Sequence, residues 1–394
     1  MDWNSQHTVL RVQQNDASLK VLKIGYSSGF NSTTSSDFST LGAYIGANTH
    51  LTTLYVNENE IELNEPCTGL FEGLKQNSSI NELVINDVGI LSPYIIGQDW
   101  CILTEILQTY QENNSHLTRF RICGTCLRRG FNVVVATLRS CTNLTKIELH
   151  NCMITDEQLL SVIEAVGEYR LEVLKLGGNR IGNSNDGCVA LATLLEDPNS
   201  YLRRLALAVN NIDLDGATAI VSSLSNNTKL THLSLDNNPC WEAGSTLKNV
   251  LSRLLANTSS ISSTYSSNHT LEKLKMDSRD DHIDNLMRIN RSSNDKSHVA
   301  MRKILKYHPN MNMVPLFEWN MEGDGERDLK ALPYVIDWFE RAVEAIADDE
   351  ERESYKIRER KLTAAYQFAK AMPLMFVPSS HIKGTNNKRK REGM

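Results

Sequence analysis

No stretch of this 394-residue sequence is apolar for long enough to cross a lipid bilayer. The first residues, Met1–Asn4, are polar and lack the charged-then-apolar pattern of a secretory signal. There is also no large excess of one charge, since the formal net charge is −6. These absences predict an intracellular protein, cytoplasmic or nuclear, that makes no membrane contact.

The motifs that mark common enzyme classes are missing as well. The sequence contains no Walker loop, no HExxH motif, no GxSxG motif and no dinucleotide-binding fingerprint. Its 10 histidines are scattered, and none pairs with another at the spacing of helical metal ligands. Asp280, Asp281 and Asp284 lie close together, but we expect them to cap a helix. The sequence therefore predicts a protein that is not an enzyme and holds no cofactor or metal.

Cysteine is present but follows no metal-binding or redox framework. The eight cysteines are expected to be reduced in an intracellular protein. Cys123 and Cys126 have the CxxC spacing, but the sequence contains no second CxxC pair that could complete a zinc site. A structural role is therefore expected for both thiols.

What the sequence does contain is an internal repeat. Leu171–Ile181 reads LEVLKLGGNRI, with leucine at repeat positions 1, 4 and 6, asparagine at 9 and isoleucine at 11. The alternation of Leu174 and Leu176 with polar residues predicts a strand with one buried face. The asparagine is expected to hydrogen-bond the backbone of neighbouring turns, and Cys152 stands at that position in its own repeat as a weak donor. The pattern recurs nine times, starting at residues 19, 51, 80, 117, 144, 171, 202, 230 and 271.

Most starts are 27 to 32 residues apart, which leaves about 15 residues after each strand and turn, enough for a helix. Asp156–Val166 has apolar residues on one face, and Thr155 with Gln158 predicts a capping box at its start. The repeats, with Asp215-Gly216-Ala217 opening a helix, resemble the ribonuclease-inhibitor class of leucine-rich repeats over roughly residues 19–280. The resemblance implies a right-handed α/β horseshoe, a solenoid with an inner parallel sheet and outer helices.

Four segments are expected along the chain: an N-terminal cap over residues 1–18 with an edge strand at Thr8–Val12, the solenoid over 19–282, a C-terminal helical module over 283–378, and a basic tail over 379–394. The module is expected to cap the last repeat or, alternatively, to bind a partner. It resembles the C-terminal region of leucine-rich repeat proteins common in diatoms, through Arg291–Leu305 and the motifs near Pro333 and Pro373.

Three stretches depart from the repeat. Residues 27–40 and 257–270 are rich in serine and threonine and predict surface loops, the second of them mobile. An insertion is expected near Leu91–Gly97. In the tail, the basic run Lys388, Arg389, Lys390 and Arg391 is either a nuclear import signal or a solvated end.

The inner face of the sheet is the predicted binding surface. Nine strands would give a surface on the order of 40 Å long, and positions 3 and 5 of each repeat point away from the core. The acidic residues at these positions are Glu82 and Glu148, and position 7 adds Asp236 and Asp277. The predicted partner-binding residues are Lys23, Tyr55, Arg119, Arg121, Lys146, Lys175, Arg204, His232, Lys273 and Lys275.

Two interpretations of this basic row stay open: it keeps the sheet soluble, or it binds an acidic protein surface. The leading functional prediction is a non-catalytic scaffold that binds a protein partner. The alternative is a GTPase-activating protein, because the Ran activators resemble this repeat class; those proteins carry an acidic tail, whereas this sequence ends in a basic one. Nucleic-acid binding is less favoured, because the row lacks interleaved aromatic residues for base stacking.

Overall fold

The structure, a computed structural model, describes residues 6–24, 35–57, 68–86, 116–124, 127, 130–167, 170–242 and 245–308. The chain divides into two units. Unit 1 comprises Met1–Leu255 and Asn268–Asn290, and unit 2 comprises Ala256–Ser267 and Arg291–Met394. The described part of unit 1 contains the repeats.

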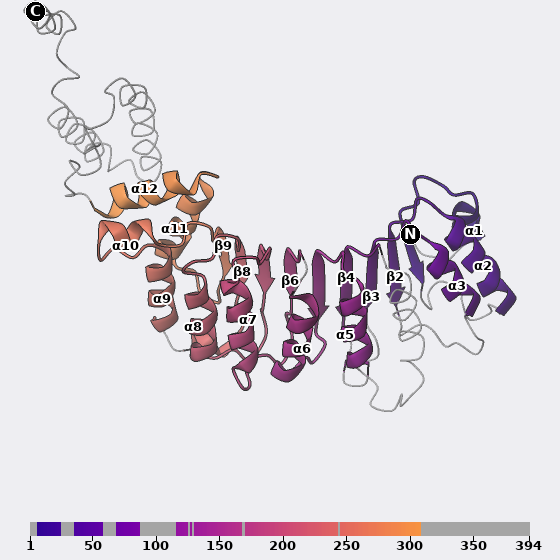
Figure 1. Cartoon of the computed structure of the whole chain (residues 1–394), viewed down its shortest axis with the longest axis horizontal. Helices are drawn as coiled ribbons and strands as arrows, with labels where there is room; N and C mark the ends of the chain where they lie inside the picture. The colour runs from indigo at the N-terminus through magenta and orange to yellow at the C-terminus, as the bar shows by residue number, and fades with distance from the viewer. Residues whose placement is uncertain are drawn as a thin grey trace, which may run out of the picture. The chain divides into compact units, whose positions relative to one another are not determined.

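Unit 1 is built on an open parallel sheet whose nine strands follow one another in sequence order (Figure 1). The leucine repeat sets the register, because each repeat pairs with the next at the same repeat position. The strands are β1 (Val21–Ile24), β2 (Thr53–Asn57), β3 (Glu82–Asn86), β4 (Arg119–Cys123), β5 (Lys146–His150), β6 (Val173–Lys175), β7 (Arg204–Ala206), β8 (His232–Ser234) and β9 (Lys273–Lys275).

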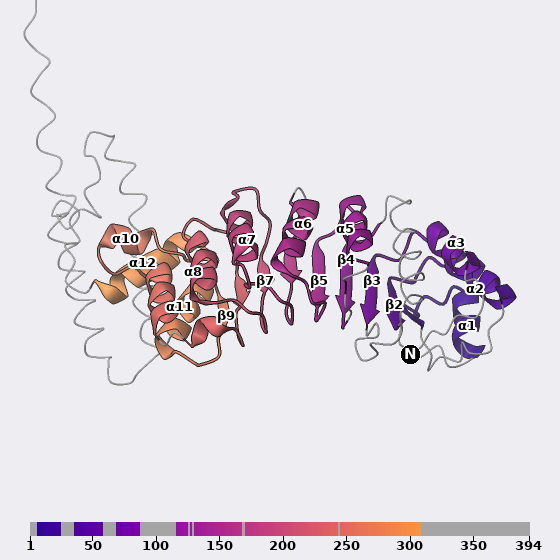
Figure 2. The ribbon, with the colours of Figure 1, turned by 90° about the horizontal axis from the view of Figure 1, so that it is seen from below.

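Helices cover one face of this sheet, as Figure 2 shows for α5 to α8. Parallel neighbours need crossover connections, and the helices provide them. In unit 1 the helices are α1 (Gln6–Gln13), α2 (Ser35–Ala47), α3 (Thr68–Gln76), α5 (Phe131–Ser140), α6 (Asp156–Val166), α7 (Asp186–Glu196), α8 (Leu214–Ser223), the 3₁₀ turn η4 (Pro239–Trp241), α9 (Thr246–Leu255) and α11 (Asp281–Arg291). Unit 2 contains α10 (Ile261–Tyr265) and α12 (Lys296–Tyr307).

The core lies between the strands and the helices. Repeat position 4 is buried from β1 to β8, and this row contains Leu22, Leu54, Leu83, Phe120, Ile147, Leu174, Leu205 and Leu233. Apolar helix residues such as Leu159, Leu191 and Ile220 pack in the same layer and are fully buried. The predicted capping box at α6 is confirmed, with Thr155 and Gln158 each accepting from the other's backbone N–H.

The asparagines at repeat position 9 form a buried ladder. The Asn179 side-chain amide donates to Leu149 O at 2.7 Å and to Leu176 O at 2.8 Å, while its Oδ1 accepts from the N–H groups of Cys152 and Ile154. Asn210 and Asn238 repeat this arrangement in the next two turns. Each rung therefore joins a turn to the one before it. As predicted, the Cys152 thiol stands in for the amide, 3.6 Å from Ile122 O.

A second asparagine ladder, which the repeat analysis did not predict, runs along the turns that lead into the strands. Its members are three residues before repeat position 1, and they are Asn48, Asn77, Asn227 and Asn268. Asn227, for example, accepts from the N–H of Leu230 and donates to Leu195 O in the preceding turn at 2.7 Å. The first ladder satisfies backbone groups in the turns after the strands, and the second satisfies groups in the turns before them.

Two predictions about irregular segments are wrong. The stretch Thr8–Val12 belongs to helix α1, not to an edge strand, because Val12 is buried and α1 packs against α2. The stretch 257–270 is not simply a surface loop, since it contains α10 and its Thr264 hydroxyl bonds to Asn257 O at 2.8 Å. The predicted loop at 27–40 ends earlier than expected, because α2 begins at Ser35.

Of the three acidic residues predicted to cap a helix, Asp280 does so, whereas Asp281 and Asp284 lie in the first turn of α11 and pair with Arg279. The Asp280 carboxylate accepts from the N–H of Ile283 at 3.1 Å, which caps the helix. Beyond residue 308 the predicted helices, their capping role and the basic run at 388–391 lie outside the described residues, as do the insertion near Leu91–Gly97 and Cys126. The four predicted segments therefore stay a prediction.

Candidate functional site

The predicted binding residues all lie on the sheet face opposite the helices, which we call the open face. Strand pairing aligns repeat position 3 and repeat position 5 into two continuous rows across the sheet. The position 3 row contains Arg119, Lys146, Arg204, His232 and Lys273. The position 5 row contains Lys23, Tyr55, Arg121, Lys175 and Lys275, with Glu148 between Arg121 and Lys175.

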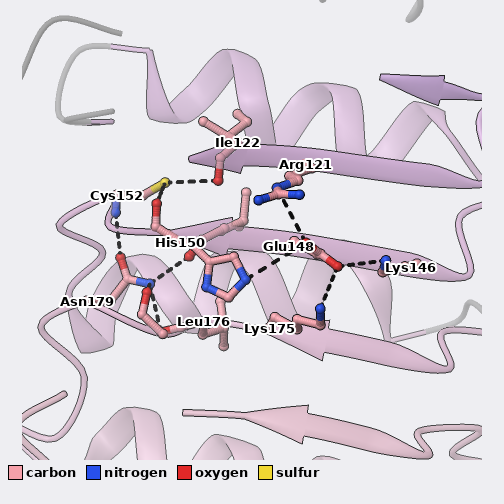
Figure 3. A network of polar contacts seen from close by, with 11 residues as sticks. Arg121, Ile122, Lys146, Glu148, His150, Cys152, Lys175, Leu176 and Asn179 are labelled. Carbon is pink, nitrogen blue, oxygen red and sulfur yellow. Dashed lines mark hydrogen bonds and ion pairs between the residues drawn. The ribbon is translucent and has the colours of Figure 1, made fainter. Parts of the chain in front are cut away.

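The structure brings three of these cations together around one carboxylate. Lys146 Nζ lies 2.7 Å and Lys175 Nζ 2.8 Å from Glu148 Oε1, and Arg121 Nε lies 3.5 Å from Glu148 Oε2. The side chains come from three adjacent strands, β4, β5 and β6, and converge on one point (Figure 3). We call Arg121, Lys146, Glu148 and Lys175 the central cluster.

The anion of the central cluster is covered, and its cations are not. The Glu148 side chain is only 4% exposed, whereas the side chains of Arg121, Lys146 and Lys175 are 43%, 32% and 36% exposed. A charge is buried at acceptable cost only when it is paired. One carboxylate among three cations leaves a surplus of positive charge, and it is this charge that faces solvent.

Electrostatics keep Glu148 ionised despite its burial. Burial by itself would raise the pKa of the carboxyl, but hydrogen bonds from Lys146 and Lys175 outweigh it and lower the pKa to about 2. His150, on the same strand, has its Nε2 atom 3.9 Å from Glu148 Oε2. Burial lowers the pKa of His150 below its ordinary value of 6.5, so its ring is neutral at physiological pH.

Other predicted residues are dispersed along the open face. Arg119 Nη1 lies 3.7 Å from Glu82 Oε2, which also accepts from the Thr53 hydroxyl. Lys23 Nζ lies 5.8 Å from the centre of the Tyr55 ring, within reach of a cation–π contact. These contacts lie towards β1, on the N-terminal side of the central cluster.

Towards β9, the acidic residues at repeat position 7 accept hydrogen bonds from nearby residues. Asp236 accepts a hydrogen bond from the Ser234 hydroxyl, and Asp277 accepts one from the N–H of Asn237. Lys273 and Lys275 are exposed on β9, three strands beyond Lys175. The open face therefore has its densest group of cations at β4–β6.

The role of Glu148 was missed by sequence reasoning, which counted it only as an acid opposing the basic row. The signal was present in the spacing Lys146-x-Glu148 and in the equivalence of Arg121, Glu148 and Lys175 at repeat position 5. Aligning consecutive repeats would have placed these three side chains next to one another.

The described residues contain neither a metal-binding cluster nor a helix that could cross a membrane. Within the described residues, no group of three or more His, Cys, Asp or Glu side chains is arranged to hold a metal ion. No helix in the same part of the chain is both long and apolar enough to cross a membrane. Among the described cysteines, Cys123, Cys141, Cys152, Cys188 and Cys240 form no disulfide bond, and burial raises the pKa of Cys188 and of Cys240 to about 12, so these two thiols are protonated.

Replacing Glu148 by glutamine should destabilise the protein in a pH-dependent way. Because the folded pKa of about 2 lies below the ordinary value of 4.5, ionised Glu148 stabilises the fold above pH 4.5, and this contribution is lost as the pH falls towards 2. The expected loss at pH 7 is on the order of 3 kcal/mol in the free energy of unfolding. Urea unfolding of both proteins at pH 7 and near pH 3 measures it.

The exposed Glu164 on α6 provides the control. Its replacement by glutamine is expected to change the free energy of unfolding by less than about 0.5 kcal/mol at either pH. If the loss caused by Glu148→Gln were the same at both pH values, the carboxylate charge would not be what stabilises the central cluster.

Comparison with known proteins agrees with this architecture. No family model matches the sequence. The chain is 32% identical over 125 residues to NACHT, LRR and PYD domains-containing protein 14 of Mus musculus, and 37% identical over 97 residues to protein 5 of the same series in Mus musculus. The aligned parts cover 31% and 24% of this chain. The sequence repeat, the strand register and the two mouse relatives all indicate the same fold. The fold is an α/β leucine-rich repeat solenoid.

The leucine-rich repeat chain spans only 11% and 8% of the length of these two relatives. Among solved structures, it is 18% identical to the tropomodulin C-terminal domain of Caenorhabditis elegans, which covers 48% of this chain and 99% of that one, with a TM-score of 0.29. An internalin of Listeria monocytogenes is 15% identical, covering 52% of this chain and 64% of that one, with a TM-score of 0.26. At these scores the likeness has no bearing on function.

Proposed function

We propose that this leucine-rich repeat chain is a non-catalytic scaffold that binds an acidic surface of a partner protein on its open face. The observation that carries the proposal is the central cluster, in which Glu148 is buried beneath three partly exposed cations. A partner that approaches this face meets Arg121, Lys146 and Lys175, and their charge favours carboxylates.

The central cluster also favours binding over a merely solubilising role for the basic row. Lysines that keep a sheet face soluble need no fixed position, and ordering a long side chain costs conformational entropy. Here Lys146 and Lys175 are both held within 2.8 Å of one Glu148 oxygen. Preorganised cations lose less entropy when a partner binds, which raises affinity.

The repeat class belongs to the same proposal. We infer the ribonuclease-inhibitor class from the crossovers, because α5 to α8 are helices of 10 or 11 residues. The names of the two mouse relatives include leucine-rich repeats, which supports a repeat scaffold. The GTPase-activating alternative stays a prediction, since neither the repeat motif nor the central cluster assigns an arginine to a nucleotide.

The salt dependence of binding tests the proposed function. Proteins captured from native cells by the intact chain would be purified and titrated against it at increasing sodium chloride. We expect the affinity to fall by about tenfold between low and physiological ionic strength, where exposed charges are screened beyond about 8 Å. Binding to the open face with an affinity independent of salt would contradict an acidic partner surface.

A further inference from the structure

The turn that follows β7 carries an exposed valine in a conformation that valine rarely adopts. Val209, at repeat position 8 after β7, has φ of 57° and is 54% exposed. In a β-branched residue this left-handed backbone is strained, and in folded proteins such strain persists only when the surroundings impose it. Here the repeat imposes it, because the Val209 N–H donates to Asp236 O at 2.9 Å, as the Gly178 N–H donates to Ala208 O.

In other repeats, position 8 is occupied by residues that suit a left-handed backbone. Position 8 is also left-handed in four further repeats, where it is occupied by Gly124, Asn151, Gly178 and Asn237. Glycine and asparagine tolerate this backbone at little or no cost. A valine there gives up stability and places an apolar side chain in water, so its benefit has to come from something other than folding.

Small residues lie beside this valine in its own repeat and in the preceding one. Gly177, Ala206 and Ala208 are partly exposed and have no bulky side chain, and with Val209 they form a low apolar surface that we call the shelf. His150 lies at its edge, because a Cβ added to Gly177 would be 3.3 Å from His150 Nδ1. The shelf therefore lies between the His150 ring and Asp236, which follows β8 at the position equivalent to Ala208.

The shelf directly adjoins the central cluster. Ala206 pairs with Lys175 across β6 and β7, and Lys175, the last residue of β6, is two residues before Gly177 in the chain. Lys175, at repeat position 5 on β6, and Val209, at repeat position 8 after β7, lie one strand spacing apart across the sheet and three residues apart along it, or about 11 Å in all. Three residues of extended chain span about the same distance. A segment crossing the strands could therefore reach both features.

We infer that the open face takes an extended acidic segment of a partner protein, with an acidic side chain on the central cluster and an apolar side chain three positions away on the shelf against Val209. This inference rests on the proposed function, and adds the class of segment and its spacing. Charge complementarity fixes which end of the segment is acidic. The cations Arg121, Lys146 and Lys175 lie on one side of the shelf, and Asp236 lies on the other.

Val209→Asn separates binding from folding. Asparagine occupies the equivalent left-handed position in two other repeats, so the variant is expected to fold and to raise Tm by about 2 °C or more. Its affinity for the segment is expected to fall about tenfold, because the apolar contact is lost. The matched control is Val189→Asn, since Val189 is 56% exposed but lies on α7 in the helix layer.

The probe is a random peptide library displayed on phage and selected on the immobilised full-length protein. We expect the wild type and Val189→Asn to enrich peptides with an acidic residue and an apolar residue three positions away. Val209→Asn should keep the acidic preference and lose the apolar one. Arg121→Gln/Lys175→Gln should lose both, since the acidic residue anchors the segment.

The outcomes distinguish the two proposals. Enrichment without acidic residues would overturn the proposed function and this inference together. Acidic enrichment with no apolar residue at the third position, or affinity unchanged in Val209→Asn, would overturn this inference alone. Competition by a single-stranded oligonucleotide as strong as that by the selected peptide would make phosphate the ligand and would overturn both proposals.

Discussion

Replacing Asn179 by alanine is expected to lower the free energy of unfolding by about 3–5 kcal/mol, the largest effect on stability that we predict. Asn179 is 7% exposed, and its amide makes hydrogen bonds to two carbonyl groups and two N–H groups. Alanine would leave these four backbone groups buried without partners, and each such group costs about 1–3 kcal/mol. Urea unfolding followed by circular dichroism measures the change.

Two further variants sharpen this test. Asn179→Asp keeps the shape but removes both donors to Leu149 and Leu176, so we expect it to be no more stable than alanine. Asn211 is exposed, and its side chain donates to Asn183 Oδ1 at the surface, so Asn211→Ala should cost less than about 1 kcal/mol. Equal losses at Asn179 and Asn211 would show that the buried ladder does not carry the stability assigned to it.

Removing two charges with Arg121→Gln/Lys175→Gln is expected to weaken binding of the acidic partner about a hundredfold, or about 2.7 kcal/mol. These side chains are exposed cations of the central cluster, and the variant still leaves Lys146 to pair with Glu148. The fold should therefore survive, which Tm would verify. Isothermal titration at fixed ionic strength would measure the affinity.

The control removes the same charge elsewhere. Lys229 precedes β8 and Arg253 lies on α9 in the helix layer, and both are exposed. Lys229→Gln/Arg253→Gln should bind within about threefold of the wild type, because only long-range attraction changes. If the two double variants lost equal affinity, overall charge rather than the central cluster would explain binding.

The sheet could be predicted from the sequence almost completely. All nine strands lie where the leucine pattern put them, because alternation with a period of two allows only one face to be buried. Cys152 behaves as predicted, because position 9 meets equivalent backbone carbonyl groups in the four repeats that start at residues 144, 171, 202 and 230. The second asparagine ladder was also readable, as Asn-x-x-Leu in 48–51, 227–230 and 268–271.

Other features could not be predicted from one repeat at a time. Alternation places Glu148 on the open face, but its burial depends on long side chains from the repeats on either side. The strain at Val209 follows from the left-handed turn that neighbouring repeats share. A valine considered alone would not predict a left-handed backbone. Helix α1 has too few apolar residues to distinguish it from a short strand in isolation.

Because each asparagine at repeat position 9 donates a hydrogen bond to the preceding repeat, the solenoid can lengthen or shorten only by whole repeats. Excising residues 171–201 would bring Asn210 against Leu149 O, which now accepts from Asn179, and the ladder would close again. The same excision would delete Lys175 and Gly177 and place Arg204 beside Lys146. The loss of one repeat would therefore leave the fold intact but remove the proposed binding surface.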